Sequence, residues 1–162
     1  HLYMGEYAVT VPETGRVTGD IPFKGKHVNM EVYVDNFGVA GEPPTYPVIE
    51  MTNLMPQYGL TGNHLQPSTT TYYPTVTYDA TKKVNASLFQ VLDFGNDNKI
   101  EIIVKNQGGD VRCRFDLKQY MIDNGISIDN LNERTVSVLV KFTDLGVLIT
   151  VPKWEIVPVN PF

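Results

Sequence analysis

Cysteine, tryptophan and long apolar runs are scarce in this chain of 162 residues, which contains one Cys and one Trp. Cys113 alone forms no intrachain disulfide, and one thiolate is fewer than a structural zinc site requires. No apolar run approaches the ~18 residues of a membrane-spanning helix. A chain of this length can bury roughly 70% of its surface on folding. We therefore expect one globular domain whose core is stabilised by packing alone.

Positive charge is also scarce, because 13 Lys and Arg stand against 18 Asp and Glu, for a formal net charge of −5. Residues 1–81 hold three basic and eight acidic side chains, and residues 82–162 hold ten of each. No basic cluster results. Nucleic-acid binding depends on clustered Lys and Arg that displace counterions from phosphates. The sequence argues against a nucleic-acid partner.

Patterns of catalytic residues are missing. His1, His27 and His64 are too far apart in the sequence to form a metal-binding pair of the H-x-H kind. The four serines all lie outside a G-x-S-x-G motif, so the nucleophile turn of the common serine hydrolases is absent. We expect a protein that is not an enzyme and that holds no cofactor.

One polar cluster has the chemistry of a cation site. Asp93, Asn96, Asp97 and Asn98 place four oxygen-bearing side chains within six residues, which a hard cation such as Ca²⁺ could use. Their spacing differs from that of the EF-hand loop, however, and a tight turn uses the same residue types for their local hydrogen bonds. We expect a turn here and no metal site.

The residues that are abundant indicate an all-β fold. The chain has 20 Val, 10 Ile and 15 Thr against 4 Ala, and Gly and Pro together number 24. Apolar residues alternate with polar ones in several segments, as in half-buried strands. The expected strands are 7–11, 17–23, 27–34, 46–54, 72–78, 86–92, 99–105, 110–117, 135–142 and 147–157. Short strands separated by turns at this spacing predict an antiparallel two-sheet sandwich.

Segment 110–117 combines a strand with the start of a helix. Its alternation places Val111, Cys113 and Phe115 on one buried face. Asp116 is positioned to cap a helix of about two turns that buries Leu117, Tyr120 and Met121, and Gly125 is positioned to end it. We expect this helix to be the only one.

Three aromatic residues are candidates for ligand contact. Tyr72, Tyr73 and Trp154 could stack on the apolar faces of sugar rings. The alternative for Trp154 is a place in the core in register with Ile156, and the alternation in this segment favours it. Loops 38–46 and 62–71 are the expected variable contact surfaces, because long polar loops at the ends of a sandwich commonly carry recognition.

Segment 47–56 (Pro-Val-Ile-Glu-Met-Thr-Asn-Leu-Met-Pro), followed by Leu60-Thr61-Gly62, resembles the second domain of Bacteroidales fimbrial subunits of the type V pilus class. Phe115-Asp116-Leu117 after a hairpin, the strand at 138–142 and the segment 146–151 occur in the order that such carboxy-terminal domains show. The resemblance covers roughly residues 2–157.

The resemblance implies a transthyretin-like Greek-key sandwich that comprises residues 1–162. It also implies that this sandwich is the carboxy-terminal domain of a longer exported protein at the outer membrane, the cell surface or the fimbrium. It implies a non-enzymatic fimbrial or adhesion subunit whose partners are other fimbrial subunits, joined by strand addition. A host protein or glycan is a further expected partner, and membrane contact would come only through an anchor absent from this chain. The alternative function is a carbohydrate-binding module of an outer-membrane glycan-uptake system that uses Tyr72, Tyr73 and Trp154.

Overall fold

The structure is a computed structural model that describes residues 2–38, 46–57, 59, 69–129 and 131–154. The elements within these ranges are β1 (Tyr3–Met4), β2 (Lys24–Gly25), β3 (His27–Asp35), β4 (Val48–Leu54), β5 (Thr70–Tyr72), β6 (Thr77–Asp79), β7 (Val84–Leu92), β8 (Glu101–Lys105), β9 (Val111–Asp116), α1 (Leu117–Asp123), β10 (Thr135–Thr143) and β11 (Gly146–Thr150). Among the described residues, no helix is both long and apolar enough to cross a membrane.

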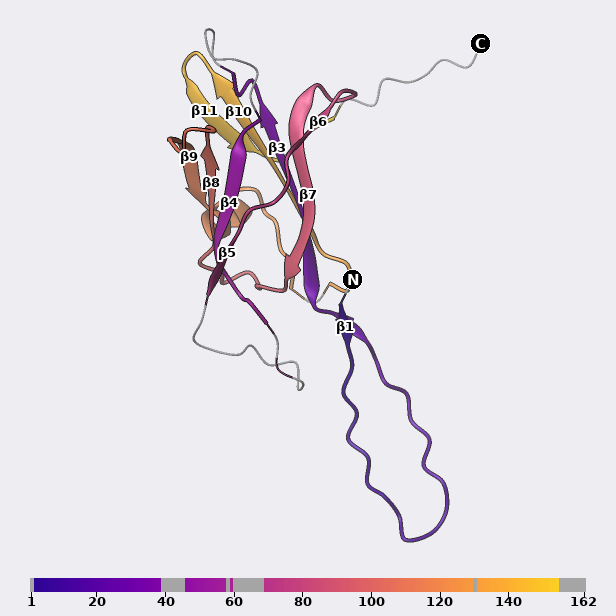
Figure 1. Cartoon of the computed structure of the whole chain (residues 1–162). Helices are drawn as coiled ribbons and strands as arrows, with labels where there is room; N and C mark the ends of the chain where they lie inside the picture. Colours follow the sequence, from indigo (N-terminus) through magenta and orange to yellow (C-terminus); the bar gives the residue numbers. More distant parts are fainter. Residues whose placement is uncertain (1, 39–45, 58, 60–68, 130, 155–162) are drawn as a thin grey trace, which may run out of the picture.

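The strands form a sandwich of two sheets, which confirms the predicted all-β architecture (Figure 1). One sheet has the order β11-β10-β3-β7-β6 and the other the order β5-β4-β8-β9, while β1 and β2 form a separate small pair. The strand pairs are antiparallel, as predicted, except that β3 and β10 pair in parallel. The two strands are distant in the sequence, and the chain crosses to the other sheet between them.

The alternating apolar positions of β3 and β10 face the core, as their period of two predicts. The side chains of Val28, Val32 and Val34 are fully buried, and so are those of Val136, Val138 and Val140. They pack against Ile49, Met51, Ile102 and Val104 from the facing sheet. The contribution of these buried side chains is about 1.5–3 kcal/mol each, which is enough to stabilise the fold without a disulfide or a metal.

Segments 7–11 and 17–23 lie outside the sandwich, so their prediction as strands of it is wrong. They form the two limbs of a long arm that extends from β1 and β2 (Figure 1). The limbs touch each other, because a Cβ added at Gly19 would lie 2.5 Å from the ring of Tyr7. The two limbs have no second layer of secondary structure that could cover their apolar side chains. Val9 and Phe23 are accordingly exposed.

Two further strand predictions need correction. The expected strand 72–78 is divided between β5 and β6, which belong to different sheets, and Pro74 between them has no N–H to donate to a ladder. The last strand ends at Thr150 instead of 157, and residues 155–157 lie outside the described ranges.

Val111 does not share the buried face of Cys113. A register shift in the β8–β9 pair places Cys113 opposite the buried Val104 but Val111 opposite Lys105. One extra residue reverses the alternation of a strand. Val111 is therefore exposed, whereas Cys113 is buried and burial raises the pKa of its thiol.

The helix α1 forms as predicted. The Asp116 carboxylate accepts a hydrogen bond of 2.7 Å from the backbone N–H of Gln119, and Gly125 follows the helix with φ of +64°. Leu117, Tyr120 and Met121 are buried, and the Tyr120 hydroxyl donates a hydrogen bond of 2.6 Å to the Ser137 carbonyl on β10. The helix thus closes one end of the core.

Titration of Tyr120 should make the fold less stable in alkaline solution. Burial raises the pKa of Tyr120 to about 12, whereas an unfolded tyrosine has a pKa of about 10. Above pH ~10 the unfolded chain releases this proton while the folded chain retains it, so the free energy of unfolding should fall between pH ~10 and ~12, by at most ~2–3 kcal/mol.

Urea unfolding measured from about pH 8 to 12 checks this expectation, with Tyr120→Phe as the comparison. The variant has no proton to lose at this position, so its stability should decline less steeply above pH ~10. Parallel curves for the two proteins would contradict the role given to Tyr120.

Candidate functional site

Four described strands form the edges of the two main sheets: β6 and β11 in one, β5 and β9 in the other. An edge strand presents unpaired N–H and C=O groups on one side, and these groups can pair with a strand from another chain. The edges are therefore the places at which this fold itself permits assembly.

Three of these edges carry features that discourage such pairing. β5 and β6 are three residues long, and β5 joins its neighbour with an irregular register. β9 is longer, but it carries Arg112 and Arg114 and has the register shift beside Lys105. Short strands, charges and bulges are the usual means by which proteins protect an edge.

β11 has none of these features. Its five residues include no charged side chain, and they pair with β10 in unbroken register. Val147 lies opposite the buried Phe142 and so belongs to the core face of the sheet. The side chain of Val147 is nevertheless 40% exposed. The core is thus incompletely covered beside β11.

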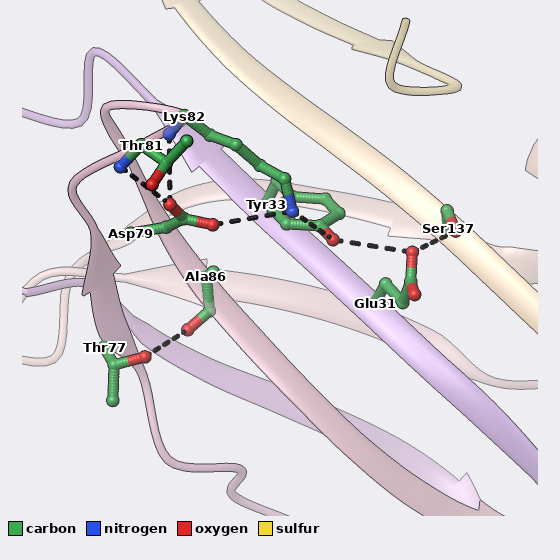
Figure 2. Close-up of polar contacts among 8 residues, drawn as sticks. All are labelled: Glu31, Tyr33, Thr77, Asp79, Thr81, Lys82, Ala86 and Ser137. Carbon is green, nitrogen blue, oxygen red and sulfur yellow. Dashed lines mark hydrogen bonds and ion pairs between the residues drawn. The ribbon is translucent and has the colours of Figure 1, made fainter. Parts of the chain in front are cut away.

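The outer face of the same sheet carries a chain of polar contacts (Figure 2). The Lys82 ammonium lies 3.4 Å from an Asp79 carboxylate oxygen and donates a hydrogen bond of 3.2 Å to the Tyr33 hydroxyl. That hydroxyl donates to Glu31 at 3.5 Å, and the Ser137 hydroxyl donates to the same carboxylate at 2.6 Å. The contacts join the β6–β7 turn to β3 and β10.

The surroundings of Lys82 and Asp79 in these polar contacts favour the charged form of each side chain. The hydrogen bond to Tyr33 and the neighbouring Asp79 carboxylate raise the pKa of Lys82. Hydrogen bonds from the backbone and side chain of Lys82 lower the pKa of Asp79. Both groups therefore stay ionised near neutral pH.

Trp154 covers this cluster. Its ring meets the Tyr33 ring edge-on at a centroid distance of 5.0 Å, and the Lys82 ammonium lies 5.2 Å from its centroid. The expectation that Trp154 packs in the core is wrong: its side chain is 39% exposed on the outer face. The physical reason is that β11 ends at Thr150, so the alternation of the strand does not continue to Trp154.

The tyrosines predicted to contact a ligand lie elsewhere. Tyr72 is on β5 and packs against the ring of Phe89 at 5.5 Å between centroids, and Tyr73 follows it with 60% of its side chain exposed. No contact seen among the described residues links either tyrosine to Trp154. Ligand contact by Tyr72, Tyr73 and Trp154 stays a prediction.

The polar side chains of the turn at 93–98 bond to other residues of the protein. Asp93 pairs with Arg134, and Asp97 pairs with Lys118. The Asn96 side chain bonds to Ser127 and Asp129, and the Asn98 side chain bonds to backbone groups of the turn, Gly95 and Ile100. Within the described ranges, no three His, Cys, Asp or Glu side chains form a group that could hold a metal ion.

Solved structures show which proteins share this fold. The fimbrial anchor protein Mfa2 from Porphyromonas gingivalis is 14% identical with a TM-score of 0.59, over 80% of this chain and 46% of that chain. A candidate adhesin from Bacteroides ovatus is 13% identical with a TM-score of 0.66, over 94% and 57%. A candidate polysaccharide-binding protein from Bacteroides thetaiotaomicron is 12% identical with a TM-score of 0.65, over 91% and 57%. The chain thus spans about half the length of these proteins.

The fold is therefore that of a β-sandwich class that includes fimbrial and adhesin proteins. The family itself is shown by the sequence: residues 1–160 match the fimbrillin-A associated anchor proteins Mfa1 and Mfa2, and the chain belongs to this family. The resemblance seen in the sequence is confirmed at this level. No curated protein matches the chain.

Replacement of Trp154 tests whether the cluster holds the segment after β11. Trp154→Ala removes the ring contact with Tyr33 and the cation–π contact with Lys82, so the free energy of unfolding should fall by about 1–2 kcal/mol. Leu145→Ala is the control, because Leu145 is fully exposed and should change stability by less than about 0.5 kcal/mol. Urea unfolding followed by circular dichroism measures both, and equal effects would contradict the packing role.

Proposed function

We propose that this chain is a domain of a non-enzymatic fimbrial or adhesion subunit, and that the edge of β11 accepts a strand from a neighbouring subunit. The observation that carries the proposal is the combination of an uncharged, regular edge with Val147, a core-face residue that is 40% exposed. Membership of an anchor-protein family supports the assembly role.

Strand addition at β11 would satisfy two needs at once. The added strand would pair with the free main-chain groups of β11, and alternate side chains of that strand would enter the sandwich. An apolar side chain at such a position would cover Val147 and replace its contact with water. We expect the partner strand to be extended and to carry apolar residues at every second position.

The place of the chain in a longer protein is part of the proposal. This chain spans 46–57% of the length of the solved structures that share the fold, which supports a domain of a longer protein, and we infer that it is the carboxy-terminal one. A fimbrial subunit is exported, and we infer a location at the outer membrane, the cell surface or the fimbrium.

A lysine in the β11 edge should block assembly. Val147→Lys places a charge at a position that the incoming strand would have to bury, which is the means by which natural edges avoid pairing. We expect the full-length native protein with this substitution to lose the high-mass ladder on an unheated denaturing gel, in cell envelopes of the producing bacterium. Heating should collapse the ladder of the unsubstituted protein to one band.

Leu88→Lys is the matched control, because Leu88 is an exposed apolar residue on β7, a strand with neighbours on both sides. Its ladder should persist. The absence of any ladder from the unsubstituted protein, or an unchanged ladder with Val147→Lys, would overturn strand addition at β11.

A further inference from the structure

A cavity of about 560 Å³ opens at one end of the five-stranded sheet. It lies where β3 ends and the β6–β7 hairpin turns. This volume lies within the ~300–1,000 Å³ typical of small-molecule sites. β6 is the edge opposite β11, so the cavity is separate from the proposed assembly edge.

The lining of the cavity divides into an apolar floor and an aromatic rim. Val34, Phe37 and Val84 line it and are buried. Tyr46 and Tyr78 also line it, but 51% and 53% of their side chains are exposed. Exposed tyrosine rings beside a buried apolar floor offer flat surfaces on which a ring-shaped ligand can stack.

Besides Asp35, the described lining has three polar side chains, namely Asn36, Lys83 and Asn85. Asn36 and Lys83 both have left-handed backbones, with φ of 52° and 58°. A non-glycine residue in this conformation costs of order 1–3 kcal/mol, and such residues cluster at functional sites. In the part of the chain that the structure describes, none of these three side chains has a hydrogen-bond or ion-pair partner. Their donors are free to meet a ligand.

The described lining of the cavity holds one charged side chain of each sign, Asp35 and Lys83. The Asp35 carboxylate lies 3.3 Å from the Lys141 ammonium, which offsets its charge. Lys82, the neighbour of Lys83, is engaged by Asp79 and Tyr33 on the outer face of the sheet (Figure 2). Among the described residues of the lining, the Lys83 ammonium is therefore the charged group that has no ion-pair partner and can meet an anion.

We propose that this cavity binds a carboxylated saccharide. The pyranose ring stacks on Tyr78, the hydroxyl groups bond to Asn36 and Asn85, and the carboxylate pairs with Lys83. Aromatic faces, amide groups and one cation are the combination that recognises a ring with apolar faces, many hydroxyls and one negative charge. The site differs from the sequence-based candidates Tyr72, Tyr73 and Trp154, and it does not depend on the assembly role of β11.

The test is a titration of the ¹⁵N-labelled chain, followed by NMR, with two acidic probes and their neutral counterparts. The acidic probes are the hyaluronan tetrasaccharide and 3′-sialyllactose; the neutral ones are the carboxyl-reduced tetrasaccharide and lactose. We expect an acidic probe to shift amide signals of residues 34–38 and 83–85 with a Kd of about 1 mM or tighter, and its neutral counterpart to bind at least about 5-fold more weakly.

Substitutions then assign the binding to the cavity. Tyr78→Ala should weaken binding of the acidic probe about 10-fold or more, because it removes a stacking surface. Lys83→Gln should abolish the preference for the acidic over the neutral probe while weak binding remains. Tyr73→Ala is the matched control, an exposed tyrosine outside the cavity, and should leave affinity within about 2-fold.

Three results would overturn the proposal. The first is the absence of signal shifts with both acidic probes at about 10 mM. The second is equal binding of acidic and neutral probes by the unsubstituted chain. The third is binding that is lost with Tyr73→Ala and kept with Tyr78→Ala, which would move the saccharide to the site predicted from the sequence. Signals of the apolar core that remain in place show that each variant is folded.

Discussion

Seven residues of β10, from Thr135 to Lys141, pair in parallel with residues 29–35 of β3, and the positions of the other strands follow from this ladder. Two parallel neighbouring strands need a long crossover connection, because a tight turn can join only antiparallel strands. Here the crossover between the two strands contains the whole four-stranded sheet and α1. The β3–β10 pair is thus at the centre of one layer, and the connection between its two strands contains the other layer.

The central pair also separates the two candidate interaction surfaces. β11 follows β10 through a hairpin and so becomes one edge, while β7 and then β6 follow on the other side of β3, and β6 is the opposite edge. Assembly through β11 would leave the cavity at the β6–β7 turn accessible. A subunit of this design could be joined to a polymer at one side and still bind a ligand at the other.

Adjacent lysines show how one turn serves two surfaces. Lys82 lies over the ring of Tyr33, with its ammonium 4.6 Å from the ring centroid, and stabilises the outer face with Trp154. Lys83 adopts a left-handed backbone and lines the cavity. The Asp79 carboxylate, which accepts backbone hydrogen bonds from Thr81 and Lys82, fixes the turn in between. The turn thus places Lys83 at the cavity, and its side chain has no hydrogen-bond or ion-pair partner among the described residues.

The all-β class, the core faces of β3 and β10, and the helix with its cap at Asp116 could all be predicted from the sequence. These features depend on local periodicity and on hydrogen bonds between residues three or four apart. The lack of clustered charge and of catalytic motifs was equally local information. The resemblance to a family could also be seen in the sequence, because it rests on the order of such segments.

Which strands are edges, where a register shifts and which side chains cover a strand face all depend on tertiary contacts. Val111 and Val147 follow the alternation of buried strands, yet one is turned outward by a bulge and the other borders an open edge. Tyr33 occupies a polar-face position in the sequence but is buried under Lys82 and Trp154. Pairing partners distant in the sequence fix these outcomes, and a period of two carries no information about which partner a strand meets.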